Sequence, residues 1–131
     1  MKYVLFLAML LAGCATGPPP APGEPAPQEL PPPDAQEKRE NVAVAGLMQS
    51  ARADSAAGRL STAAASLERA LRIEPRNPRL WHELARVRLK QGEYAQAQSM
   101  AARSNAWAGN DSALREENQR LIEQAREAAG R

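Results

Sequence analysis

A similarity of the chain to itself at an offset of 34 residues constrains its fold more than any other feature. When residues 44–77 are aligned with residues 78–111, similar residue types meet at equivalent positions. The matched pairs include Leu47 with Trp81, Ala51 with Ala85, Gly58 with Gly92, Leu60 with Tyr94, Ala63 with Ala97, Leu67 with Ala101 and Ile73 with Trp107. In an alanine-rich segment with few prolines, this period predicts two copies of one helical unit stacked side by side.

Start and stop signals divide this part of the chain into helices. Asn77 followed by Pro78 is an N-cap with proline at the first helical position. Gly92 ends that helix, because glycine takes a left-handed cap without steric cost. Asp111 caps a last helix, with an apolar stripe of Leu114, Leu121, Ile122 and Ala125. The predicted helices span about 38–56, 61–74, 78–91, 94–107 and 112–129.

The repeated unit resembles the tetratricopeptide repeat. NPRLWHELARVRLKQGEYAQAQSMA contains W-x-x-L-A followed by Q-G-E-Y-x-x-A, and GRLSTAAASLERALRIEPRN contains the closing pattern A-L-x-I-x-P. The resemblance implies an all-α fold, a short solenoid with repeats near 44–77 and 78–111 and a capping helix at 112–129, in a domain of residues 38–131. Arg88 departs from the family, which usually has an aromatic residue there. Because a stable stack usually needs three repeats, weak self-association stays open.

The first residues are typical of an exported lipoprotein. Residues 1–13 form a predicted signal peptide, with Lys2 before an apolar run that is too short to span a bilayer. The chain's single cysteine, Cys14, ends the sequence Leu-Ala-Gly-Cys, which resembles the bacterial lipobox. That resemblance implies a lipidated Cys14 that anchors the chain in a membrane. Ala15 in place of aspartate implies the outer membrane, on its periplasmic face. An ordinary signal peptide before a chance cysteine is the alternative.

Between the anchor and the helical domain lies a proline-rich segment, residues 14–37. Nine of the chain's eleven prolines fall within residues 11–33, and the segment has too few apolar residues to offset the entropy of folding. We predict a disordered linker that, at about 3.1 Å per residue, reaches roughly 70 Å and holds the domain away from the membrane. The competing interpretation is that PPPAP and LPPPD dock into an aromatic groove of a partner.

Composition argues against several function classes. The formal net charge is only +2, and it falls to +1 when the signal peptide with Lys2 is removed, so nucleic acid is not an expected partner. His82 is the only histidine, and no metal-ligand spacing surrounds it. The chain also has no G-x-S-x-G sequence and no glycine-rich phosphate loop. We therefore predict no catalytic residues, no metal and no cofactor, and a binding protein instead of an enzyme.

The tetratricopeptide resemblance implies that the first helix of each repeat lines a concave groove. Arg79, His82, Arg86 and Lys90 follow i, i+3, i+7 and i+11, so they share one helix face. Arginines there could hold carboxylates through forked hydrogen bonds, although a merely solvated helix face is the alternative. The candidate groove residues are Met48, Arg52, Arg79, His82, Arg86, Lys90 and Arg120. Trp81 and Trp107 occupy repeat positions that predict packing in the core instead.

The order of parts resembles a family of small lipoproteins. A lipobox, a proline-rich linker and a short tetratricopeptide domain also occur together in outer-membrane lipoproteins of pseudomonads that activate a class A penicillin-binding protein, the bifunctional enzyme of peptidoglycan synthesis. The resemblance implies that such a synthase is the protein partner. Two alternatives stay open, which are an adaptor for a periplasmic protease and a structural subunit of an outer-membrane assembly or secretion machine.

Overall fold

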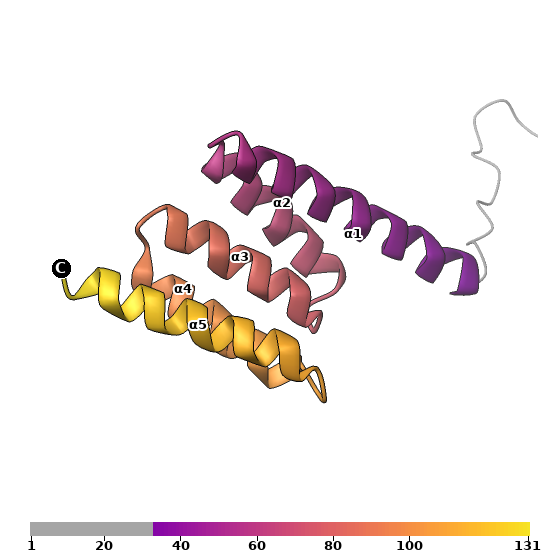
Figure 1. Ribbon diagram of the computed structural model, residues 1–131. Coiled ribbons are helices and arrows are strands. Elements are labelled where there is room, and N and C mark those ends of the chain that lie inside the picture. The colour runs from indigo at the N-terminus through magenta and orange to yellow at the C-terminus, as the bar shows by residue number, and fades with distance from the viewer. Residues whose placement is uncertain (1–32) are drawn as a thin grey trace, which may run out of the picture. The chain divides into compact units, whose positions relative to one another are not determined.

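The computed structural model describes residues 33–131, with side chains from Asn41 onward. The predicted signal peptide, the lipidation site at Cys14 and most of the predicted linker lie outside the described residues. Within them the chain is all-α, as predicted (Figure 1). The helices are α1 (Pro33–Ala56), α2 (Leu60–Ile73), α3 (Pro78–Lys90), α4 (Tyr94–Trp107) and α5 (Ser112–Ala129). In these residues, no helix is both long and apolar enough to cross a membrane.

The observed helix ends agree with the predicted ones to within a residue, except at the start of α1. This helix begins at Pro33 and not near residue 38, so it includes the last part of the segment predicted as linker. Proline is compatible with the first turn of a helix, because the backbone N–H that it lacks would have no partner inside the helix. The proline-rich composition therefore masked a helix start.

The predicted caps of α3 and α5 are confirmed. The Asn77 side-chain oxygen accepts hydrogen bonds from the backbone N–H groups of Arg79 at 3.0 Å and Leu80 at 3.4 Å. The Asp111 carboxylate accepts one from the Leu114 backbone N–H at 3.0 Å. Gly92 has a φ of +79°, a conformation that side chains with a Cβ rarely adopt, directly after α3. These caps and the turn are set by residues adjacent in sequence.

The helices form two rows. In Figure 1, α1, α3 and α5 lie in front, and α2 and α4 lie behind them. Each front helix packs against a rear helix, α1 on α2, α3 on α4 and α5 on α4, and the front helices also contact one another in the order α1, α3, α5. This is the arrangement expected of two stacked helix pairs with a capping helix.

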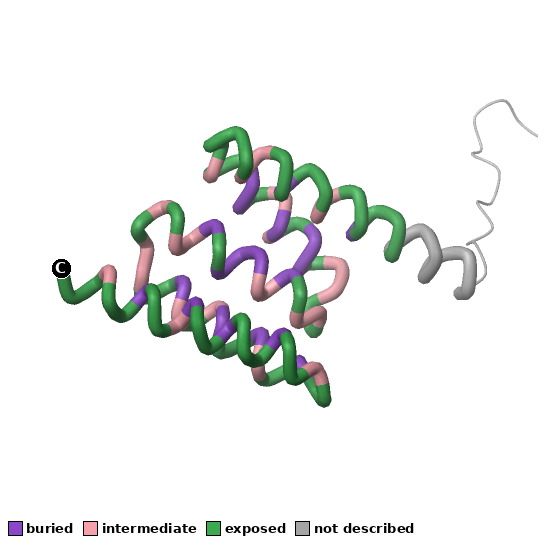
Figure 2. Tube along the Cα trace, viewed as in Figure 1, coloured by how far each residue is buried: buried purple, intermediate pink, exposed green. Residues whose placement is uncertain are grey.

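Two clusters of buried side chains hold the helices together. Figure 2 marks the buried residues in purple along the Cα trace. We call the larger cluster, which joins α1, α2 and α3, the first layer, and the smaller cluster, which joins α3, α4 and α5, the second layer. The first layer consists of Val44, Ala51, Ala63, Ala64, Leu67, Ala70, Leu71, Leu80, Leu84 and Val87. The second layer consists of Ala85, Ala97, Ala101, Leu121 and Ala125, so alanines let its helices approach closely.

The two tryptophans differ from each other. Trp81 is half-buried and packs against the first layer, and its indole N–H donates to the Pro75 carbonyl at 2.8 Å. The prediction that Trp107 packs in the core is wrong, because this residue is 46% exposed. Trp107 is the last residue of α4, and its ring contacts the guanidinium of Arg76, which lies 5.2 Å from the ring centroid.

Candidate partner-binding groove

Two adjoining hollows run along the front row of helices. The first, of about 260 Å³, lies between α1 and α3 and the second, of about 480 Å³, lies between α3 and α5. Arg86 and Lys90 line both hollows, so we treat the pair as one feature and call it the groove. Arg52 and Glu83 belong to the first hollow, and the second includes His82, Leu89, Glu117, Arg120 and Gln124.

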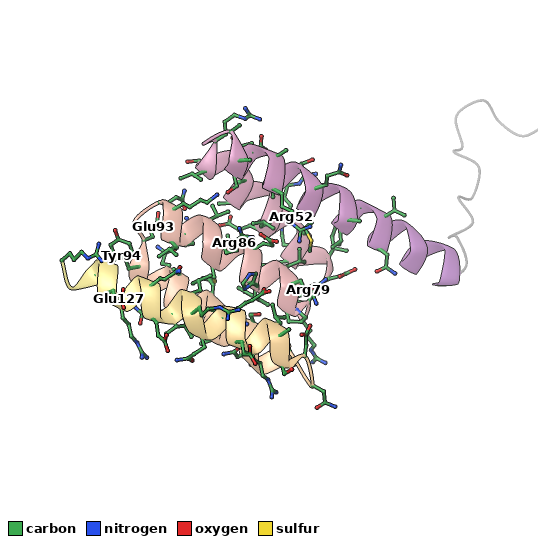
Figure 3. All side chains as sticks on the ribbon, viewed as in Figure 1. Arg52, Arg79, Arg86, Glu93, Tyr94 and Glu127 are labelled. Atoms are coloured by element: carbon green, nitrogen blue, oxygen red, sulfur yellow. The ribbon has the colours of Figure 1, made fainter. Side chains whose placement is uncertain are left out.

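The groove carries arginines at equivalent positions of successive front helices. Arg52, Arg86 and Arg120 are separated by 34 residues each, and they come from α1, α3 and α5. The side chains of Arg52 and Arg86 are 57% and 54% exposed, so their guanidinium groups are accessible from the solvent side (Figure 3). With Lys90, four basic side chains line the groove against two acidic ones, Glu83 and Glu117. The groove is therefore positively charged.

A single carboxylate positions two of these arginines. Arg52 binds one oxygen of Glu83 through Nε at 2.8 Å and Nη2 at 2.7 Å, and Arg86 donates to the other oxygen at 3.3 Å. The Glu83 side chain is only 11% exposed. Ion pairs with an exposed partner contribute little to stability, so the main effect of Glu83 is to hold two guanidinium groups side by side between α1 and α3.

Below the groove, a chain of hydrogen bonds joins α3, α4 and α5. Asn118 is fully buried, and its amide N–H groups donate to Ser104 Oγ and Asn105 Oδ1, each at 2.8 Å. Ser104 donates in turn to the Pro78 carbonyl at 2.8 Å. The Asn118 oxygen lies 2.7 Å from His82 Nδ1, which must carry the proton because an amide oxygen only accepts. We call His82, Ser104, Asn105 and Asn118 the polar network.

The structure brings together five of the seven candidate groove residues, which are Arg52, His82, Arg86, Lys90 and Arg120. His82 contributes less to the accessible surface of the groove than its position on α3 implies, since its side chain is 11% exposed and its Nδ1 is bound to Asn118. Met48 is half-buried against the first layer and does not line either hollow. Arg79 is also absent from the lining, and it forms an ion pair with Asp111 at 2.8 Å, next to the start of α5.

The sequence-based prediction of the site does not include the Glu83 carboxylate or the buried polar side chains of Ser104 and Asn118. Glu83 occupies a helix position between predicted groove residues, and nothing in its neighbourhood marks it as the partner of two arginines. Asn118 and Ser104 did leave a signal, because at the 34-residue offset they replace the apolar residues Leu84 and Ala70. A polar residue at a repeated core position indicates a buried hydrogen-bond network. Among the side chains that the structure describes, no group of three or more histidine, cysteine or acidic residues could hold a metal ion.

Comparison with known proteins agrees with this architecture. The family described as tetratricopeptide repeat matches residues 55–116. Among solved structures, the globular C-terminal domain of P. aeruginosa LpoP is 44% identical in sequence, with a TM-score of 0.66, and the match covers 67% of this chain and 83% of that domain. This chain belongs to the LpoP family of tetratricopeptide-repeat proteins. A comparison with curated proteins gave no significant match.

The repeat match covers the centre of the groove more fully than its edges. Residues 55–116 include all of α3, and with it Glu83, Arg86 and Lys90. Arg52 and Arg120 lie just outside the matched range, on α1 and α5. In this member of the LpoP family, the helices that flank the recognised repeat therefore supply the outer two arginines of the groove.

Proposed function

We propose that this protein is a lipid-anchored protein on the periplasmic face of the outer membrane, and that it binds and activates a class A penicillin-binding protein. It acts as a binding partner and not as an enzyme. The observation that carries the proposal is the 44% identity to the C-terminal domain of LpoP over 83% of that domain. The lipobox at Cys14 and the proline-rich segment support it, because an outer-membrane protein needs a long connection to reach a synthase in the inner membrane.

In this proposal the groove is the surface that contacts the synthase. Adjacent packed helices lie about 8–10 Å apart, and an extended chain advances about 3.3 Å per residue. Arg52, Arg86 and Arg120 come from three successive front helices. Acidic side chains roughly three residues apart in an extended segment would thus reach successive arginines. We expect a segment of this kind in the synthase, held by charge-assisted hydrogen bonds.

Activation then requires a difference in affinity between two states of the synthase. A ligand shifts a conformational equilibrium only by as much as it binds one state better than the other. The groove would bind the acidic segment in the conformation that it has in the active synthase. The chain supplies no catalytic group in this scheme, and its effect saturates when all synthase molecules are bound.

The test uses the full-length chain in detergent with a purified class A penicillin-binding protein. We expect the chain to capture the synthase and to raise its rate of glycan polymerisation. Arg86→Glu should weaken binding about tenfold, since it reverses the central charge of the groove. Arg69→Glu makes the same change at an exposed position of α2 outside the groove, and should bind and activate normally.

Each other outcome contradicts a different part of the proposal. Capture and activation that are equal for both variants would keep the partner and remove the groove as its site. Capture without a change in rate would indicate a structural subunit. Absence of capture, together with longer lifetimes of envelope proteins in cells that lack the gene, would favour the adaptor for a protease.

A further inference from the structure

A second pocket lies on α2, α3 and α4 and shares no residue with the groove. It has a volume of about 290 Å³. Its apolar lining comes from Leu71, Trp81, Leu84 and Met100, and its charged lining comes from Arg72, Arg88, Arg103 and Glu68. We call it the rear pocket, because rear helices α2 and α4 supply much of its wall. Neither the repeat pattern nor the groove accounts for it.

We propose that the rear pocket binds one large hydrophobic side chain of a protein segment, with acidic residues on either side of that side chain. The energetic centres of protein interfaces are aromatic or aliphatic anchors in well-packed pockets, which fits a concave apolar hollow better than a flat contact with a membrane surface. The acidic flanks follow from the charge of the rim. This surface is separate from the groove, so it does not depend on the identity of the groove's partner.

The aromatic wall of the rear pocket is held in place before anything binds. The Trp81 indole N–H donates to the Pro75 carbonyl at 2.8 Å, and the Arg103 guanidinium lies 4.9 Å from the centroid of the ring. A side chain restrained on both sides loses little conformational entropy when a ligand packs against it, and such preorganisation raises affinity. Trp81 thus provides a ready contact surface for a hydrophobic anchor.

The charge on the rim selects acidic neighbours. Arg88 is already paired with Glu68 at 2.7 Å and with Glu93 at 3.4 Å. Among the described residues, Arg72 and Arg103 form no ion pair, and both are exposed. The accessible charge is therefore positive. A second copy of the chain would bring the same two arginines to the contact, so charge repulsion disfavours self-association through this face.

Arg88 connects the pocket to a departure from the family pattern. The tetratricopeptide repeat usually has an aromatic residue at this position, and here an arginine lines the pocket instead. Arg88 Nε is also the one buried side-chain nitrogen or oxygen atom without a hydrogen-bond partner among the described residues. Leaving a buried donor unsatisfied is unfavourable. A bound segment that brought an acceptor to Arg88 would remove this penalty.

The test follows the fluorescence of Trp81 in the full-length chain in mild detergent. The chain has only two tryptophans, so Trp107→Phe leaves Trp81 as the single reporter. The probe is the peptide acetyl-Asp-Asp-Phe-Asp-Asp-amide, and the matched peptides replace its phenylalanine by alanine or its aspartates by lysines. We expect a saturable change with the probe, and affinities at least about tenfold lower for both matched peptides.

Charge reversals locate the binding site. Arg103→Glu and Arg72→Glu should each weaken binding of the probe about tenfold, measured from the midpoint of the titration. Arg120→Glu, which lies in the groove, should change it less than about twofold. Circular dichroism confirms that each variant is folded. A probe that does not saturate, an alanine peptide that binds equally well, or a loss confined to Arg120→Glu would each overturn the proposal.

Discussion

Between α1 and α3 the domain is held by apolar side chains, whereas between α3 and α5 the helices meet around a buried asparagine. The two regions are built from equivalent positions of the repeat, so their residues can be compared directly. Across the offset of 34 residues, the pairs are Met48 with His82, Leu67 with Ala101, Ala70 with Ser104 and Leu84 with Asn118. Each replacement makes the region where α3, α4 and α5 meet smaller or more polar than the corresponding region of α1, α2 and α3.

The difference indicates a division of roles. Apolar contacts contribute most of the stability but specify geometry loosely, since similar shapes pack in several ways. The polar network is satisfied only when His82, Ser104 and Asn118 meet in one arrangement, because a buried amide without partners is costly. We infer that the first layer stabilises the domain and that the polar network sets the position of α5. That position matters, because α5 carries Arg120 of the groove.

The largest expected effect comes from making the first layer resemble the second. Leu67 is 1% exposed, and Leu67→Ala introduces the residue found at the equivalent position 101. We expect the free energy of unfolding to fall by about 3 kcal/mol, from lost burial and from the cavity that remains. Urea denaturation followed by circular dichroism measures it. Val42→Ala, at a residue that is 68% exposed, is the control and should change stability by less than about 0.5 kcal/mol.

The next effect tests the polar network. Asn118→Leu introduces the residue of the equivalent position 84, and it removes one hydrogen-bond partner each from Ser104, Asn105 and the His82 Nδ1–H. We expect a loss of about 2–3 kcal/mol in the same denaturation experiment. The triple variant His82→Met, Ser104→Ala and Asn118→Leu replaces all three groups by their first-layer equivalents. Of the polar network only Asn105 then remains, and its side chain is half-buried and can turn to solvent, so the stability should return to within about 1 kcal/mol of the parent.

Hydrogen exchange on this triple variant separates stability from specificity. If the polar network sets the position of α5, amides of α5 should exchange faster in the triple variant than in the parent, even at equal global stability. If the α5 amides exchange equally slowly in the triple variant and in the parent, the shape of the packed side chains alone positions α5. A triple variant as unstable as Asn118→Leu would instead show that the close packing around Ala97 and Ala101 leaves no room for the larger side chains.

Much of the fold follows from signals that are close together in the sequence. The ends of α4 and α5 agree with the predicted ranges, because their caps and turns involve residues only a few positions apart. The start of α1 was missed, since a proline-rich composition argues for disorder while a single proline at a helix start is well tolerated. Trp107 was misplaced because the repeat register predicts the helix face that a residue occupies and does not say how much of that face is covered at the last residue of α4.

The candidate groove was predictable in outline and not in its chemistry. Helical spacing placed Arg86 and Lys90 on one face, and the repeat placed Arg52 and Arg120 beside them. The bond from Arg52 to Glu83 depends on how α1 packs against α3, which no local pattern determines. His82 was predicted to face a partner, yet its main contact is Asn118, 36 residues away in sequence. Local sequence patterns do not predict which residues that are far apart in the sequence will contact each other in the fold.

The smallest expected effect comes from Trp107→Ala. Trp107 is 46% exposed and its ring forms a cation–π contact with Arg76, so we expect a loss of about 1 kcal/mol, the range of an exposed cation–π pair. The equivalent residue Ile73 packs against the first layer, and Ile73→Ala should cost more, about 1–2 kcal/mol. Repeating the denaturation at two protein concentrations completes the comparison. A loss of 3 kcal/mol or so for Trp107→Ala that grew with concentration would mean that a second copy covers Trp107, because only association makes stability depend on concentration.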